Sequence, residues 1–181
     1  MKFLKDNASM ISRLIITHIA MSVFGLVIFL ATNLQAPHIM LLASIASVAF
    51  YAVLVYTTMW EYGAKDKPAY DAGRRTGAGK CGFFSALAAE SIWIVLAIVY
   101  VVLSFVNKDA SLIVYTVEFL TSCCYTGIEV FLKNHVIKDS VFVPAAVYIL
   151  GSVVISAVSA FGYVLGTKDL TIVPKKNNTK K

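Results

Sequence analysis

Long apolar segments alternate with short polar ones along this chain. Four of the apolar segments are long enough to cross a bilayer, which takes about 20 helical residues. These segments are Leu14–Ala31, Ile39–Met59, Phe83–Val106 and Val141–Leu165. We therefore predict an all-α fold, a polytopic transmembrane helical bundle with four full spans.

A fifth segment, Leu112–Leu132, is also long enough to span but has two different faces. When it is plotted at about 100° per residue, polar side chains fall on one stripe and apolar ones lie opposite. The polar stripe consists of Tyr115, Glu118, Ser122, Tyr125, Glu129 and Lys133. Such a helix can lie in the membrane interface, or it can cross the bilayer with its carboxylates facing the bundle interior.

The distribution of positive charge favours four spans over five. With a cytoplasmic N-terminus, four spans keep most lysines and arginines, including those of the C-terminal tail, in the cytoplasm. We therefore expect Leu112–Leu132 to be an amphipathic or re-entrant helix on the outer side, with five spans as the alternative. Residues 1–167 then form one transmembrane domain with a cytoplasmic loop at 60–82, and residues 168–181 form a basic, disordered tail.

The composition agrees with a membrane protein. Hydrophobic residues make up 59% of the 181 residues and charged residues only 14%, whereas soluble proteins have about 25% charged residues. The net charge is +6, but the basic residues gather at the ends of the apolar segments, which is typical of membrane topology signals. We therefore expect a multi-pass protein of the cell membrane, in contact with the lipid bilayer and without a nucleic-acid partner.

The polar segment Trp60–Lys80 contains three basic residues beside a glycine-rich turn that opens the third span. A helix N-terminus attracts anions through its free amides and its dipole, and anionic lipid headgroups are the nearest candidates. The alternative is that these charges set the topology and pair locally with Asp66 and Asp71. The three candidate lipid or phosphate contacts are Arg74, Arg75 and Lys80.

A second set of candidates consists of ionisable residues at membrane depth. Glu90 lies near the start of the third span, where a charge costs several kcal/mol unless it is paired, hydrated or protonated. His18, in the first span, is a candidate proton-relay partner. Glu118 and Glu129 lie about three helical turns apart on one face. We expect these two carboxylates on a solvated surface, with a polar pathway as the alternative.

The last span carries small residues at helical spacing. Ser152, Ser156 and Ala160 form one ridge, and Gly162 with Gly166 continues it as a GxxxG motif. Small residues allow two helices to approach closely in a membrane. The motif therefore predicts a packing surface between helices, with a dimer interface as the second interpretation.

The chain contains no complete catalytic set and no spacing typical of a metal or cofactor site. We therefore predict a small, non-enzymatic membrane protein that acts as a subunit or accessory of a membrane assembly, with a transport assembly as one candidate. A homo-oligomer or a membrane protein is then the expected partner. One alternative is a small transporter or channel that uses the buried carboxylates. Another is a membrane enzyme that acts on lipid phosphates through the basic segment.

Overall fold

The computed structural model describes residues 2–32, 36–137 and 140–170, and these ranges are helical without strands. Four helices are long and apolar enough to cross a membrane. They are α2 (Ala8–Thr32), α3 (Pro37–Asp71), α4 (Ala78–Val106) and α7 (Phe142–Thr167). The predicted all-α bundle with four spans is confirmed. Most of the predicted tail, residues 171–181, lies outside the described ranges.

Large apolar side chains cover the outside of the spans. Val27, Val53, Val102 and Leu150 are each between 55% and 65% exposed, and each belongs to one of the four spans. A soluble protein rarely exposes such a continuous apolar surface. The outer surface of the bundle is therefore suited to the lipid hydrocarbon.

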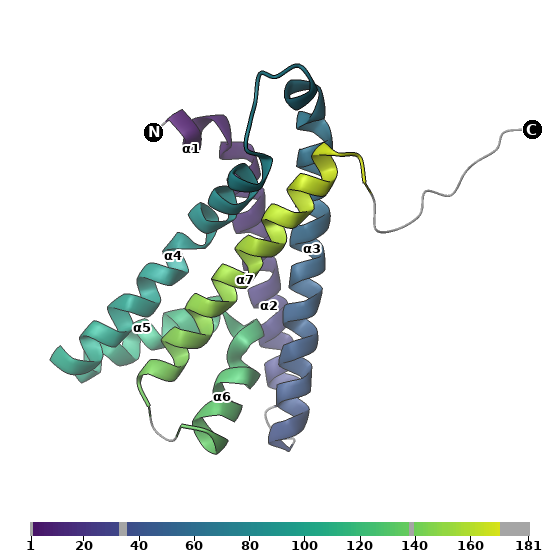
Figure 1. Ribbon diagram of the computed structural model, residues 1–181. Helices are drawn as coiled ribbons and strands as arrows, with labels where there is room; N and C mark the ends of the chain where they lie inside the picture. Colours follow the sequence, from purple (N-terminus) through teal and green to yellow (C-terminus); the bar gives the residue numbers. More distant parts are fainter. Residues whose placement is uncertain (1, 33–35, 138–139, 171–181) are drawn as a thin grey trace, which may run out of the picture.

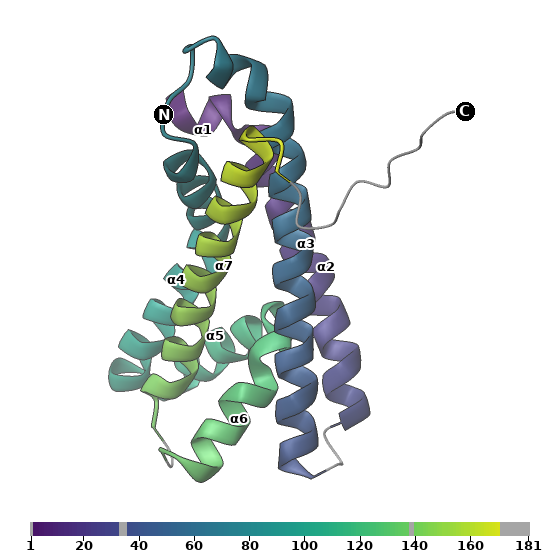
Figure 2. The ribbon, with the colours of Figure 1, turned by 45° about the vertical axis from the view of Figure 1, so that its right-hand side comes forward.

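The two ends of the bundle differ. The N-terminus, the turn between α3 and α4 and the end of α7 lie at one end, which we call the N-terminal end (Figure 1). The short helix α1 (Lys2–Asp6) lies across this end. The end of α2, the start of α3, the end of α6 and the start of α7 lie at the opposite end (Figure 2). That the N-terminal end faces the cytoplasm stays a prediction.

The predicted amphipathic or re-entrant segment forms two helices rather than one. Helix α5 (Lys108–Thr121) turns back along α4 from the opposite end, and a short 3₁₀ turn, η1 (Cys123–Tyr125), follows inside the bundle. Helix α6 (Thr126–His135) then returns to the opposite end (Figure 2). We call α5, η1 and α6 the re-entrant pair, because the chain enters and leaves at the same end.

The break between α5 and α6 is held by side chains of the neighbouring spans. The Ser44 hydroxyl donates to the Cys124 carbonyl at 2.5 Å. The Thr121 carbonyl accepts from the Ser22 hydroxyl and from Nε2 of His18, the latter at 3.0 Å. Irregular backbone at membrane depth is tolerated only where protein or water satisfies it. These donors therefore stabilise the break.

The predicted loop at 60–82 is mostly helical, which corrects the expected extent of the polar connection. Helix α3 continues to Asp71, and α4 begins at Ala78, so only residues 72–77 connect them. The polar part of α3 stays helical because Met59 and Gly63 remain buried against its neighbours. The turn itself uses Gly73 and Gly77 at φ of 68° and 73°, a conformation that favours glycine.

The GxxxG motif is a packing surface within the chain, as predicted. A Cβ atom at Gly162 would meet the Tyr56 carbonyl, and one at Gly166 would meet the Trp60 carbonyl. Both carbonyls belong to α3, so the two helices touch along their backbones. This surface is therefore occupied by α3 of the same chain.

Candidate functional site

Glu90 lies at the centre of the bundle, where all four spans meet. Its side chain is 2% exposed. The Tyr51 hydroxyl donates to its Oε1 at 2.6 Å and the Ser152 hydroxyl donates to its Oε2 at 3.2 Å. Nδ1 of His18 lies 3.0 Å from the same Oε1. The structure thus brings together Glu90 and His18, two of the residues predicted for a polar pathway.

Both ring nitrogens of His18 have partners. Nε2 faces the Thr121 carbonyl at 3.0 Å, and a carbonyl can only accept, so Nε2 is the donor there. Nδ1 lies 3.1 Å from the Tyr51 hydroxyl and 3.0 Å from Oε1 of Glu90. His18, Tyr51 and Glu90 therefore form one hydrogen-bonded cluster.

The environment of His18 keeps its ring in place. The Trp93 indole stacks on it, with 3.7 Å between the ring centroids. The Tyr51 ring meets its edge, with 5.5 Å between the centroids. His18 itself is only 2% exposed. The ring is therefore held at a fixed position, away from bulk water.

A second carboxylate, Glu129 of α6, is completely buried. Its Oε1 accepts from the Tyr115 hydroxyl and from Nζ of Lys133, both at 2.8 Å. Its Oε2 accepts from the Tyr148 hydroxyl at 2.7 Å. Glu129 and Lys133, four residues apart on α6, therefore form an ion pair, and the two tyrosines add further donors from α5 and α7.

Glu118 is also completely buried, and neither of its carboxyl oxygens has a hydrogen-bond partner among the described residues. An unpaired charge in this place costs several kcal/mol, which favours the neutral, protonated acid. The expectation that Glu118 and Glu129 lie on a solvated surface is wrong. Helix α5 exposes its apolar side instead, with Leu112 and Ile113 65% and 67% exposed, and so its polar stripe faces inward.

Helix α7 carries a row of hydroxyl groups on its inward face, and this row runs past the Glu129 and Glu90 sites. The row follows helical spacing of three or four residues, and over 15 residues it extends about 22 Å at 1.5 Å per residue. All five side chains are buried. We call this row the hydroxyl column; it consists of Tyr148, Ser152, Ser156, Ser159 and Tyr163.

At the N-terminal end the hydroxyl column reaches Asp66. The Asp66 carboxylate accepts from the Tyr163 hydroxyl and from Nη1 of Arg75. Burial lowers the pKa of the Arg75 guanidinium, but the Asp66 carboxylate together with Tyr163 and Cys81 outweighs this effect, so the pKa is raised. A cavity of about 130 Å³ adjoins the pair and is also lined by the exposed Asp6 and Ser9. Three members of the hydroxyl column, Tyr148, Ser152 and Tyr163, therefore donate to Glu129, Glu90 and Asp66, and Asp66 lies at a cavity.

Tyr125, in the break of the re-entrant pair, lies between the Glu129 and Glu90 sites. It is 3% exposed, and its hydroxyl has no partner within the described part of the chain. Its ring meets that of Tyr148 edge to face, with 6.1 Å between the centroids. It also covers Gly151, where a Cβ would lie 2.6 Å from the ring. The glycine thus makes room for Tyr125 beside the hydroxyl column.

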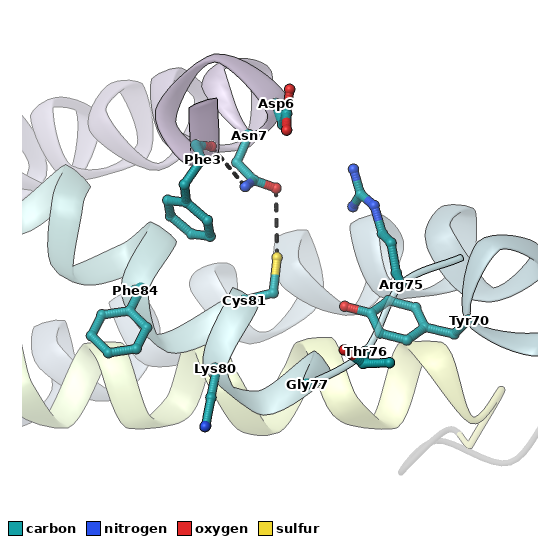
Figure 3. A pocket seen from close by; sticks show the side chains of 10 residues that line it. All are labelled: Phe3, Asp6, Asn7, Tyr70, Arg75, Thr76, Gly77, Lys80, Cys81 and Phe84. Carbon is teal, nitrogen blue, oxygen red and sulfur yellow. Dashed lines mark hydrogen bonds between the residues drawn. The ribbon is translucent and has the colours of Figure 1, made fainter. Parts of the chain in front are cut away.

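The predicted basic contacts are divided by the structure. Arg75 and Lys80 line one cavity at the N-terminal end (Figure 3), whereas Arg74 is exposed on the turn. The local pairing considered for these charges holds for Arg75, whose Nη1 lies 2.5 Å from the Asp66 carboxylate.

The sequence did not indicate the tyrosine partners or the hydroxyl column. Tyr51 carried no assigned role, and Ser152 with Ser156 resembled a packing ridge. The available signal was the recurrence of hydroxyl side chains every three or four residues from Tyr148 to Tyr163. Across the described ranges, no three His, Cys, Asp or Glu side chains gather as a metal site would require.

Comparisons with known proteins identify no relative of this chain: no protein-family model, curated protein or solved structure matches it.

Proposed function

We propose that this protein conducts protons across the membrane along the hydroxyl column of α7. The observation that carries the proposal is the buried hydrogen-bonded cluster of His18, Tyr51 and Glu90 in the middle of the bundle. Chains of Asp, Glu and His at membrane depth are typical of proton relays. This function corresponds to the transporter or channel considered from the sequence.

The pathway begins at the opposite end with Lys133 and Glu129. The Lys133 side chain is 28% exposed, so it reaches the surface, while Glu129 is completely buried. When Glu129 takes up a proton, Tyr148, which donates to this carboxylate, can turn its hydroxyl away, accept that proton on its oxygen and release its own proton to the next hydroxyl. From there, Tyr125 is the next hydroxyl toward Glu90, and its free O–H can rotate between the two sites.

From Glu90 the pathway continues toward the N-terminal end. The Ser85 hydroxyl, on the same helix as Glu90, is completely buried and has no partner in the described ranges. Ser159 lies nearby, since its hydroxyl donates to the Gly82 carbonyl at 2.9 Å. Tyr163 then leads to Asp66 and the adjoining cavity. Each proton that enters at one end is balanced by one released at the other.

The decisive test is proton flux in vesicles. Purified protein is reconstituted with a trapped pH indicator, and a membrane potential is imposed. We expect internal acidification with the native chain. Glu90→Gln should reduce the flux to that of protein-free vesicles, because an amide holds no transferable proton.

A matched control uses Glu61→Gln. Glu61 is 51% exposed and only 3.8 Å from Arg13, so its substitution removes the same charge outside the pathway. We expect native flux in this variant. Equal flux in Glu90→Gln and Glu61→Gln, with both variants folded, would exclude the proposed pathway.

The accessory role predicted from the sequence has its own test. Purification in mild detergent should recover a stable membrane protein partner if the chain is a subunit of a larger assembly. A lone monomer that conducts protons would support the pathway proposed here.

A further inference from the structure

Glu118 of α5 has no part in the proton pathway proposed above, although it is completely buried. The charges of Glu129 and Lys133 both act on its carboxyl group, so it lies near that ion pair. Nζ of Lys133, however, is bound to Oε1 of Glu129 at 2.8 Å, and neither oxygen of Glu118 has a hydrogen-bond partner among the described residues. An ionised Glu118 would therefore add a second carboxylate to a site whose one cation is already engaged.

The titratable groups around Glu118 come from every helix packed around it. They are His18 on α2, Tyr100 on α4, Tyr115 on α5 itself, Glu129 and Lys133 on α6, and Tyr148 on α7. The hydroxyls of Tyr115 and Tyr148 donate to Glu129. Nε2 of His18 donates to the Thr121 carbonyl. None of these described side chains donates to Glu118, so this arrangement suits only its neutral form.

Helix α5 is held in the bundle by polar side chains. Across its 14 residues, all of which the structure describes, the buried side chains are Ser111 and Glu118. Val117 and Leu120, on either side of Glu118, are 43% and 49% exposed. Apolar burial does not drive helices together in a membrane, because lipid tails are as apolar as the side chains. The protonation of Glu118 therefore has a large influence on whether α5 stays in place.

We propose that Glu118 is a proton-binding site that holds the re-entrant pair in the bundle. With the proton bound, the neutral carboxyl group lets α5 pack beside α6, in the arrangement of this structure, which we call closed. When Glu118 releases the proton to water, its charge is buried without a partner and is repelled by Glu129. Both effects favour an open arrangement, in which Glu118 reaches water and the hydrogen bond from Tyr115 to Glu129 is broken.

The sign of the pH dependence follows from the proton count. Glu118 holds a proton in the closed arrangement and has lost it in the open one, so the closed arrangement loses stability as the pH rises above the ordinary glutamate pKa of about 4.3. The ratio of open to closed chains then rises at most about tenfold per pH unit. The rise ends where Glu118 also ionises in the closed arrangement, and buried glutamates can keep their proton up to about pH 8–9.

The test is amide hydrogen exchange of the full chain in lipid nanodiscs from about pH 5 to about pH 8. Each rate is corrected for the intrinsic effect of pH on exchange. In the native chain we expect the protection of the α5 amides to fall by up to about tenfold per pH unit. Glu118→Gln is neutral at every pH, so its α5 protection should stay constant. Glu118→Leu should do the same, and it replaces the first variant if glutamine prevents folding.

Asp109→Asn is the matched control, because Asp109 is an exposed carboxylate on the same helix. We expect the native pH dependence in this variant. Constant α5 protection in the native chain would overturn the proposal. A native pH dependence in Glu118→Gln would also overturn it, since the effect would then come from His18 or Glu129.

Infrared spectroscopy gives a second readout that uses the native chain alone. The carbonyl band of protonated carboxyl groups should weaken over the same pH range in which the α5 amides lose protection. Unchanged intensity over this range would overturn the proposal. The inference does not depend on proton conduction, so vesicles without proton flux would leave both of these measurements decisive.

Discussion

The substitution Tyr125→Phe should change stability and proton flux in opposite directions. It removes only the hydroxyl oxygen, which is buried and has no partner among the described residues. The phenyl ring keeps its contact with Tyr148 and its place over Gly151. The variant therefore tests the hydroxyl and leaves the packing of the break intact.

The stability effect can be estimated from the burial of the hydroxyl. A buried polar group without a hydrogen bond costs about 1–3 kcal/mol. Removing it should stabilise the chain by about 1 kcal/mol, or about 2–4 °C in Tm for a protein of this size. The flux should fall about a hundredfold, the low end of what one positioned proton-transfer group contributes.

Tyr56→Phe is the matched control. The Tyr56 hydroxyl is also buried without a partner in the described ranges, but it lies on α3 beside Phe161 and outside the hydroxyl column. Thermal unfolding should show a similar stabilisation of this variant, and the vesicle assay should show native flux. If Tyr125→Phe lowers the stability and leaves the flux at the native level, the role of Tyr125 is refuted. The same holds if Tyr56→Phe loses as much flux as Tyr125→Phe.

Two further substitutions test the packing and the charges of the bundle. Gly166→Leu should destabilise the chain by about 3 kcal/mol or more, because the new side chain meets backbone at the Trp60 carbonyl and cannot be accommodated by a rotamer change. Lys133→Gln should cost about 2 kcal/mol, since it leaves the buried Glu129 carboxylate with its tyrosine donors but without a cation. Denaturation in detergent measures both changes.

Each of these variants has a control with the same chemistry. Gly79→Ala places a Cβ 3.5 Å from a Val164 methyl group, an ordinary contact, so we expect little change. Lys67→Gln removes a cation 3.9 Å from Asp169, where both side chains are more than a third exposed, and should cost less than about 0.5 kcal/mol. If a control loses as much stability as its test variant, the structural reason given for that variant is wrong.

The spans could be predicted from the sequence because each depends on a local property, a run of about 20 apolar residues. The extent of α3 could not be predicted from such a local property. Residues 60–71 are polar and resemble a loop, but Gly63 packs on the α7 backbone at Tyr163 and Thr167. That contact joins positions about a hundred residues apart, and nothing in the local pattern indicates it.

The break between α5 and α6 escaped prediction for a similar reason. The segment contains no proline, and the first glycine after the break is Gly127. Its backbone is held by Ser44 and by His18 with Ser22, which belong to other helices. The candidate residues Glu90 and His18 were found because an ionisable group in an apolar run is a strong signal. Their tyrosine partner, Tyr51, was not found, since tyrosine is common in membrane helices and its presence is no signal.

The backbone contact between α3 and α7 also determines where this bundle can bend. The two helices are joined through Gly63, Gly162 and Gly166 at the N-terminal end, and they diverge toward the other end with the re-entrant pair between them (Figures 1 and 2). The glycine contacts therefore fix the two helices at one end, and the re-entrant pair separates them at the other. Amide hydrogen exchange should be slowest at the glycine contacts and fastest in α5 and α6. A movement of the re-entrant pair would then shift Tyr125 and leave Asp66 in place.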